Sequence, residues 1–503
     1  MPDLPPNAVK VDGPAVDTPA EATEERENIG AKIVRGGVWR LIAYGFATAV
    51  AVVSTSVVSR AIGPVDFAVY TTVISLVSVG LGLSDFGLLA LGMRDFAALE
   101  GAERERNMCA LITLRILFSL VATAGIIAFG LLAGYPSGTM AGLIAASIGL
   151  CVVALYTSYC VPLQATYRFT ELALLDATRQ GIWSGLMILA AVISGSVGLV
   201  IGALLPAAIV VTIAAALLVR RITTITPTWD PATMRSLLSS VGAFAVAASV
   251  GAAYVYLAQV ASDLVLNGYE SGQLALAFRV FAVTLAAGII AILGAFPLLV
   301  VSARDDLERL IYATRRIMQT AVLVGLACAI GLLNGAEFVV AILGGPKYQD
   351  AIQMLAIIGF ALPASYLLNS GSTVLLAAGR HRELVVVSVI GAALSIGVTA
   401  ALASAYGGEG AAAGIVVGEV LLAAGYLSVV ARIDRQALPG LKWAGFVLLA
   451  GSAGCAVVLI GLPAVPSAIL GIAVYGGIVL AFGALPPEIH ARIPVLGRNV
   501  TID

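Results

Sequence analysis

The sequence predicts an all-α integral membrane protein with about 14 transmembrane helices. Sixty per cent of its 503 residues are hydrophobic and only 11% are charged, against roughly 25% charged in soluble domains. The mean hydropathy is +1.02. A bilayer core about 30 Å thick needs about 20 apolar residues per helix. Charged or Gly/Pro-rich gaps divide the chain into fourteen such segments, with approximate centres at residues 49, 80, 121, 150, 187, 209, 252, 287, 325, 362, 394, 420, 452 and 476.

The placement of positive charge predicts the orientation of these segments. The 28 Lys and Arg residues concentrate in alternate gaps, and only Arg60 and Lys347 fall in the other set. Because cytoplasmic loops carry the excess of positive charge, we expect both termini to be cytoplasmic. Residues 1–30, rich in Pro and Glu, are expected to form a disordered cytoplasmic tail, and residues 487–503 a second cytoplasmic tail.

Two motifs recur at a constant offset of 212 residues, which predicts an internal duplication. Residues 162–172 and 374–384 share Leu, Ala, Arg, Glu and Leu in the same order. Residues 195–202 and 407–414 share three glycines with identical spacing. Six segments separate equivalent positions, and an even number means that both copies enter the membrane from the same side. The copies are therefore expected to be parallel repeats.

The duplication predicts two six-helix bundles around a central cleft. The first bundle, or N-lobe, covers residues 31–221, and the second, or C-lobe, covers residues 239–432. A cytoplasmic linker, residues 222–238, joins them, and residues 433–486 form two further helices. Two similar bundles that face each other can open their cleft to either side by rocking, which is the geometry of alternating access.

Several kinds of chemistry are unexpected in this chain. None of the four lysines follows a glycine, so no phosphate-binding P-loop is present. His381, His490 and the five cysteines lack the spacing of metal ligands. A net charge of −1, without basic stretches interleaved with aromatic residues, argues against nucleic acid. We therefore predict that the protein is not an enzyme, has no cofactor or metal and binds no nucleic acid.

Basic residues at membrane depth are the candidates for substrate binding. A charged side chain there costs roughly 2.5–3.5 kcal/mol on insertion scales, so it usually faces a cavity or a partner. Arg279, Arg115 and Arg179 lie within segments, and Arg60 lies at the outer end of the first. A guanidinium stays charged and grips phosphate oxygens with two parallel hydrogen bonds, so we predict that these four arginines contact a diphosphate or acidic sugar. Alternatively, Arg115 and Arg179 extend to the cytoplasmic face, and Arg279 extends outward or pairs with Asp263.

Three acidic residues are the candidates for ion coupling or charge pairing. Asp85, Asp263 and Glu419 all fall within predicted segments. Glu419 is the deepest, and a carboxylate at that depth requires a proton or a partner. Asp85 lies nearer the cytoplasmic face, where it could simply pair with Arg94 or Arg115.

Several stretches resemble a family of bacterial exporters. Arg60-Ala-Ile-Gly-Pro-Val-Asp-Phe-Ala-Val-Tyr70, Leu83-Ser-Asp-Phe-Gly-Leu88 and Arg94-Asp-Phe-Ala97 resemble the opening of polysaccharide exporters of the Wzx flippase type. Leu343-Gly-Gly-Pro-Lys-Tyr348 and Leu376-Ala-Ala-Gly-Arg-His-Arg382 are similar to signatures of that family's second half. These exporters belong to a superfamily that also contains MATE antiporters and lipid II flippases. The resemblance covers the first twelve predicted helices.

The resemblance implies a function. Such a transporter turns a polyprenyl-diphosphate-linked oligosaccharide from the cytoplasmic to the periplasmic leaflet of the cell inner membrane, for surface polysaccharide biosynthesis. Its partners would be that lipid-linked oligosaccharide, membrane lipid, and polysaccharide polymerase and export machinery. Two alternatives stay open. A MATE-like, cation-coupled multidrug antiporter would place acids and aromatic residues along the cleft, and a membrane scaffold that has lost transport would retain the same helices.

Overall fold

The computed structural model describes residues 19–223, 226–293 and 307–484, and within these ranges every regular element is a helix. The first seven α-helices are α1 (Pro19–Asp85), α2 (Leu88–Ala98), α3 (Gly101–Leu132), α4 (Ser137–Ala165), α5 (Phe169–Ser194), α6 (Val197–Gly202) and α7 (Leu204–Val219). The next six are α8 (Pro231–Asp263), α9 (Gly268–Leu293), α11 (Leu307–Leu343), α12 (Ala351–Gly359), α13 (Ala361–Ala377) and α14 (His381–Ile433). The last two are α15 (Leu441–Ala456) and α16 (Ala464–Ala481). Short 3-10 helices are η1 (Gly345–Tyr348), η2 (Arg435–Ala437) and η3 (Val457–Ile460).

The predicted fold class is confirmed. Each of the fourteen predicted segment centres lies in one of these helices. Within the described ranges, 10 helical stretches are long and apolar enough to cross a membrane. Residues 1–18 of the first predicted tail and the whole of the second, residues 487–503, lie outside the described residues. The helix α1 begins at Pro19, within the segment assigned to the first tail.

Two of the helices are too long for a single crossing. The 53 residues of α14 would extend about 80 Å at 1.5 Å per residue, more than twice the bilayer core. A kink at Gly407, with φ of 64°, divides α14 into two crossings. The 67-residue α1 is divided in the same way at Gly63, with φ of 78°. Glycine tolerates the left-handed backbone, and the following Pro64 cannot donate a backbone hydrogen bond, so the sequence breaks the helix there.

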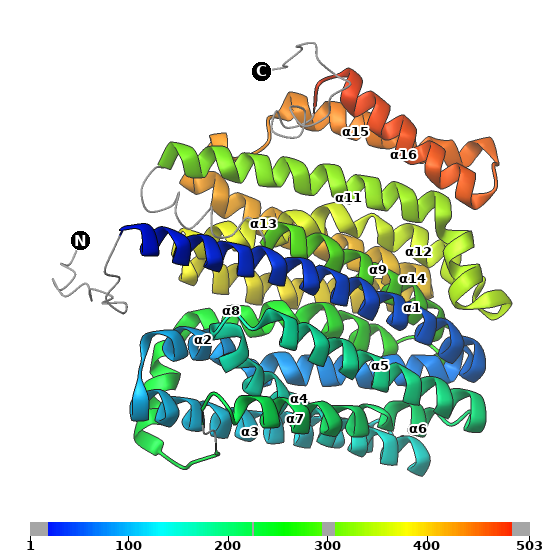
Figure 1. The fold of residues 1–503 in the computed structure, drawn as a ribbon. Coiled ribbons are helices and arrows are strands. Elements are labelled where there is room, and N and C mark those ends of the chain that lie inside the picture. The colour runs from blue at the N-terminus through cyan, green and yellow to red at the C-terminus, as the bar shows by residue number, and fades with distance from the viewer. Residues whose placement is uncertain (1–18, 224–225, 294–306, 485–503) are drawn as a thin grey trace.

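The helices run nearly parallel to one another and form two groups (Figure 1). One group contains α2 to α7, in which α4 packs against α3, α6 and α7. The other contains α9 to α14, in which α13 packs against α11 and α14. Between the groups lie α1 and α8, which contact each other and helices of both groups. We use N-lobe for α1 to α7 and C-lobe for α8 to α14.

The last two helices form a hairpin at the edge of the C-lobe (Figure 1). Both α15 and α16 pack against α11. The buried side chain of Asn334 on α11 joins all three helices, because its amide donates to the carbonyl of Gly454 and its oxygen accepts from the hydroxyl of Ser467. Polar side chains buried between membrane helices commonly join them in this way.

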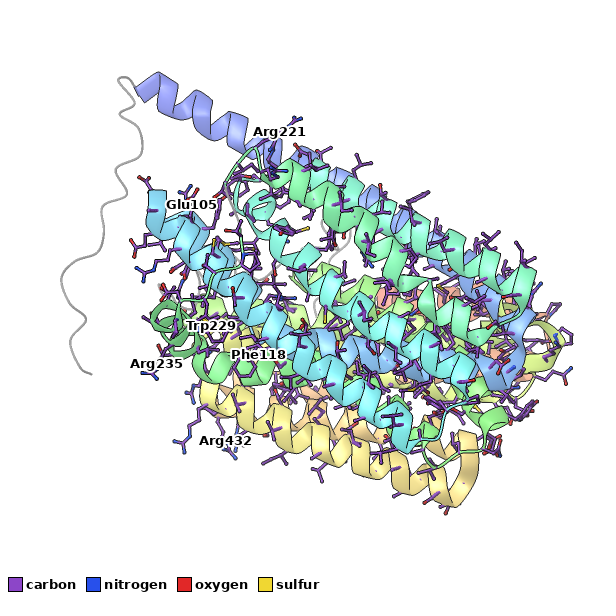
Figure 2. All side chains as sticks on the ribbon, turned by 90° about the horizontal axis from the view of Figure 1, so that it is seen from below. Glu105, Phe118, Arg221, Trp229, Arg235 and Arg432 are labelled. Carbon is purple, nitrogen blue, oxygen red and sulfur yellow. The ribbon has the colours of Figure 1, made fainter. Side chains whose placement is uncertain are left out.

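Charged residues from distant parts of the chain gather at one end of the bundle. Figure 2 shows Glu105, Arg221, Trp229, Arg235 and Arg432 at this end. Their helices are α3, α8 and α14, together with the connection after α7. This is the arrangement that the alternating charge pattern predicts for the cytoplasmic ends of the helices.

The duplicated motif adopts the same backbone in both lobes. The amide of Arg168 donates to the carbonyl of Leu163 over 2.8 Å, and that of Arg380 donates to Leu375 over 2.9 Å. Each arginine then precedes a new helix, with φ of −83° in both copies and ψ of 54° and 55°. The offset of 212 residues in the sequence is therefore an offset between matching turns.

The side chains of this turn match as well. Arg168 pairs with Glu171 over 3.1 Å, and Arg380 pairs with Glu383 over 3.0 Å. The residue before each arginine has positive φ, 58° at Tyr167 and 70° at Gly379. The same left-handed backbone conformation is thus adopted by a tyrosine in the first copy and by a glycine in the second.

Candidate functional site

Arg279 on α9 lines a cavity of about 240 Å³ between the two lobes. The cavity is formed by α1, α9 and α11, and its lining residues are Ala51, Val52, Thr55, Arg279, Val280, Val283, Thr284, Phe338, Val339, Ile342 and Leu343. Within the described residues, Arg279 has no hydrogen bond or ion pair. Two of the predicted acidic residues, Asp263 and Glu419, bond to other side chains. The nearby Tyr70 of α1 lies within electrostatic range of the Arg279 guanidinium. The cavity therefore combines one fixed positive charge with an otherwise mostly apolar lining.

The walls of this cavity reach the surface of the helix bundle. Phe338 and Ile342 are about half exposed, although both are large and apolar. In a membrane protein, such exposed apolar side chains face lipid. A ligand with an anionic head and a hydrocarbon tail matches both parts of the lining.

Arg60 lies beside this cavity, at the end of α11. Its Nη2 donates to the carbonyls of Ala341 and Ile342 over 2.7 and 2.6 Å. The last four carbonyls of a helix have no partner within the helix, and a cation near them also interacts favourably with the helix dipole. In this conformation Arg60 therefore caps α11, while Ile342 belongs to the cavity lining.

Arg115 on α3 is the most buried of the four predicted arginines. Its Nη1 contacts Oδ1 of Asp85 over 2.6 Å, and its Nη2 donates to the hydroxyl of Thr157 on α4 over 2.9 Å. Its side chain is 2% exposed, against 33% for Asp85. Of the two partners expected for Asp85, the structure selects Arg115, whereas Arg94 pairs with Asp95. Arg115 does not extend to the cytoplasmic face.

A break between α1 and α2 positions the Asp85 carboxylate. Phe86 and Gly87 have φ of 43° and 73°, so the helix ends at Asp85 and restarts at Leu88. Asp85 Oδ1 accepts the amide of Leu89 over 3.1 Å, as well as Arg115. An acidic group at a helix N-terminus is favourable because free amides and the helix dipole attract negative charge.

Glu419 is a fully buried acid inside the C-lobe, 1% exposed. Its Oε1 accepts the hydroxyl of Tyr254 on α8 over 2.9 Å, and its Oε2 accepts the hydroxyl of Ser365 on α13 over 2.6 Å. Within the described residues no cation pairs with it. Glu419 thus joins three helices through neutral hydroxyls, as a buried carboxyl group without a cationic partner among the described residues.

Asp263 ends α8 and reaches the N-lobe. Its Oδ1 accepts the hydroxyl of Ser271 on α9, and its carboxyl group lies near Thr72 on α1. Close by, the hydroxyl of Ser75 donates to Oε1 of Gln259 over 2.9 Å, which is a second bond between α1 and α8. Asp263 therefore contributes to the contact between lobes, and it does not pair with Arg279.

Arg179 lies on α5, inside the N-lobe near Cys160 of α4. Its Nε is buried and has no hydrogen-bond partner among the described residues, and the same holds for Nε1 of Trp183 one turn further along. Arg179 is partly exposed as a whole. Its prediction as a substrate-binding residue stays a prediction.

The seven predicted residues thus lie in separate places. Arg279 and Arg60 lie at the interface of α1 and α11, Asp85 and Arg115 form an ion pair in the N-lobe, and Glu419 belongs to a hydroxyl cluster in the C-lobe. Among the described residues no group of three or more His, Cys, Asp and Glu side chains could hold a metal ion. A larger groove of about 690 Å³ lies between α4, α5, α6 and α7, and the described residues that line it are apolar or small and carry no charge.

No family model and no curated protein matches the sequence. Solved structures do match. The lipid II flippase MurJ, in an inward closed conformation, has a TM-score of 0.74 at 13% identity, covering 88% of this chain and 98% of that chain. A multidrug resistance MATE transporter of the MOP superfamily has TM-scores of 0.56 inward-facing, at 17% identity, and 0.55 outward-facing, at 19%. Those matches cover 79% and 80% of this chain, and 98% and 96% of the MATE chains.

The chain therefore shares its fold with the solved structures of the flippase MurJ and of this MATE transporter. Its apolar helices make this a multi-pass membrane protein. The similarity extends to structures described as a flippase and as multidrug transporters, so the fold by itself leaves the substrate open.

Sequence reasoning missed the hydroxyl partners of the charged residues. Thr157, Tyr254 and Ser365 each bond to one of the predicted charged groups. Hydroxyl residues are common in membrane helices, and only packing determines which of them face a charge. The helical period gave one signal that Tyr254 faces the C-lobe interior. Tyr254 lies one turn after Val250, on the face of α8 that packs against the C-lobe core.

Proposed function

We propose that this protein flips a polyprenyl-diphosphate-linked oligosaccharide from the cytoplasmic to the periplasmic leaflet by alternating access. The observation that carries the proposal is the Arg279 cavity, which joins a guanidinium to a lipid-facing apolar wall. A guanidinium binds phosphate oxygens in bidentate fashion and keeps its charge at every physiological pH. The diphosphate would bind Arg279, and the prenyl chain would remain in lipid beside α1 and α11.

The cavity matches an anion better than an organic cation. Among the residues that the structure describes, its lining contains Arg279 and no carboxylate. A cation-binding site at this position would leave two positive charges close together in a medium of low dielectric constant, which is strongly unfavourable. This argues for a lipid diphosphate over the substrates of a multidrug antiporter, although both uses occur on this fold.

Glu419 supports a role for ion coupling in the C-lobe. Both of its oxygens accept hydrogen bonds from neutral hydroxyls, so the carboxylate can bind or release a proton or cation without breaking an ion pair. A ligand or ion drives a conformational change only when it binds two states with different affinity. A carboxylate shared by α8, α13 and α14 would provide that difference when these helices move.

Binding measurements on the purified protein test the proposed function. We expect a lipid-linked diphosphate oligosaccharide to raise the thermal unfolding midpoint of the wild type, because a ligand that binds only the folded state stabilises it. Arg279→Gln should abolish the shift, and Arg279→Lys should retain part of it because it keeps the charge but loses the bidentate geometry. The matched control is Arg94→Gln, which removes an exposed arginine of the N-lobe. A shift with organic cations and none with the diphosphate would favour the antiporter.

A further inference from the structure

The end of α11 is capped by the opposite lobe. Three consecutive carbonyls of its last turn accept hydrogen bonds from α1: Ser56 and Ser59 each donate a hydroxyl over 2.7 Å, and Arg60 donates its guanidinium. These carbonyls accept no hydrogen bond from within α11, because the last four carbonyls of a helix have no partner in the same helix. The cap of a C-lobe helix therefore depends on contact with the N-lobe. We use α1–α11 seam for Ser56, Ser59 and Arg60 together with residues 341–343.

The backbone is tightly packed at the same end of the molecule. A Cβ atom added to Gly272 of α9 would lie 2.1 Å from the carbonyl oxygen of Pro64, at the kink of α1. The hydroxyl of Tyr348 donates to the carbonyl of Ser59 over 3.2 Å, and its ring meets that of Phe67 edge to face. The two lobes thus touch through backbone, hydroxyl groups and aromatic rings.

The seam also forms part of the wall of the Arg279 cavity. Ile342 and Leu343 offer their carbonyls to α1 and their side chains to the cavity. Thr55, one turn before Ser59, lines the same cavity. Movement of the end of α11 away from α1 would therefore open the cavity directly toward this end of the bundle.

We propose that the α1–α11 seam is the outer gate of the Arg279 cavity, and that Ser56, Ser59 and Arg60 hold it closed by capping α11. The inference rests on the proposed function, since it takes this cavity as the binding site. The predicted positive-inside orientation places the seam at the periplasmic end, where water can solvate the released carbonyls and Arg60. Opening exchanges these hydrogen bonds for water, so the seam opens reversibly at modest cost.

The test measures access to the cavity without any substrate. Thr55→Cys places a thiol in the cavity wall of the full-length protein, and a membrane-impermeant maleimide is added outside intact cells. We expect slow labelling in this parent and roughly tenfold faster labelling when Ser56→Ala and Ser59→Ala are added, as the loss of two hydrogen bonds implies. Arg60→Gln in the same parent should accelerate labelling in the same direction. The chain without Thr55→Cys gives the background of the five native cysteines.

Ser54→Ala is the matched control. Ser54 lies on the same helix and is buried, but its hydroxyl bonds to the carbonyl of Ala51 within α1. Equal labelling rates in the parent and in the double serine variant would overturn the gate, as would an acceleration by Ser54→Ala of the same size. Recovery of monodisperse protein checks the fold of each variant, and the serine pair keeps the test valid if Arg60→Gln is poorly expressed. Because no cargo is present, a failed gate and a wrong substrate give different results.

Discussion

The two lobes share the backbone of a repeated turn but differ in the charged groups that each buries. In the N-lobe, Arg115 and Asp85 neutralise each other over 2.6 Å. In the C-lobe, Glu419 stands among hydroxyls, without a cation among the described residues. The repeated turns at Arg168 and Arg380 match closely in backbone and ion pair. Duplication has preserved the local structure that ends one helix and starts the next, while the interiors have diverged.

This difference suggests separate tasks for the two interiors. The charges of Arg115 and Asp85 compensate each other, so we expect the N-lobe pair to serve as a fixed structural element. A single carboxylate changes its charge when it binds a proton or metal cation, so the C-lobe cluster is suited to respond to a gradient. Four experiments break or sharpen this comparison, and they follow from the largest expected effect to the smallest.

Breaking the N-lobe ion pair should have the largest effect. Arg115→Leu leaves Asp85 without its partner, and an unpaired charge at this depth costs about 3 kcal/mol or more. We expect a large loss of folded protein, measured as the thermal unfolding midpoint and the yield of monodisperse protein. Adding Asp85→Asn should recover much of the loss because it removes the uncompensated charge. Arg94→Gln, at an exposed pair, should change stability by less than about 0.5 kcal/mol. Stability of Arg115→Leu equal to that of Arg94→Gln would refute a structural role for the pair.

Neutralising the C-lobe acid should affect transport more than stability. Glu419→Gln keeps the size of the side chain and one hydrogen-bond acceptor for Tyr254 or Ser365. We expect the folded protein to persist, while gradient-driven transport falls roughly tenfold or more and no longer responds to an imposed proton or sodium gradient. Transport is measured in proteoliposomes with and without each gradient. An unchanged gradient response in Glu419→Gln would remove this residue from coupling.

Exchanging the residues of the repeated turn should have a smaller effect on stability. Gly379 has φ of 70°, where a Cβ atom is strained, so Gly379→Ala should destabilise by about 1 kcal/mol. Tyr167 already bears that strain at φ of 58°, so Tyr167→Gly should be neutral or slightly stabilising. Thermal unfolding of both variants measures the difference. Destabilisation by Tyr167→Gly as large as that by Gly379→Ala would show that the turns are not equivalent.

The smallest effect is expected at the end of the bundle that is predicted to be cytoplasmic, where Asp230 caps α8 and pairs with Arg106 of α3 over 2.5 Å. The hydrogen bond from Arg106, followed by those from Thr233, holds the pKa of the Asp230 carboxyl well below its usual range. A depressed folded-state pKa contributes stability that is present above the unfolded pKa, near 4, and is lost as pH falls through the folded pKa. Asp230→Asn should therefore lower the unfolding midpoint slightly and equally at pH 5 and pH 8. A difference that disappears between pH 8 and pH 5 would contradict this assignment.

Much of the fold follows from the sequence alone. Apolar runs of about 20 residues determine where helices can cross a bilayer, so the predicted segment at residue 394 and its neighbour at 420 are both present, one on each side of the kink at Gly407 in α14. The constant offset identified the matching turns at Arg168 and Arg380, because turns are specified by few residues. Local patterns of this kind need no knowledge of tertiary packing.

The candidate site follows from the sequence only in part. The pairing of Asp85 with Arg115 was one of two expected arrangements, and the direction of the Arg115 side chain selected it. The capping of α11 by Arg60 was missed, because that contact joins residues more than 280 positions apart. The hydroxyls around Glu419 come from α8 and α13, and their direction is fixed only when these helices pack.

The most direct measurement of the central claim is flipping of a fluorescent polyprenyl-diphosphate oligosaccharide in proteoliposomes, monitored by a membrane-impermeant quencher. The wild type is expected to move the lipid between leaflets, Arg279→Gln to lose at least about nine tenths of the rate, and Arg279→Lys to lie between the two. Wild-type flipping at the rate of protein-free liposomes, or a rate unchanged by Arg279→Gln, would contradict the account.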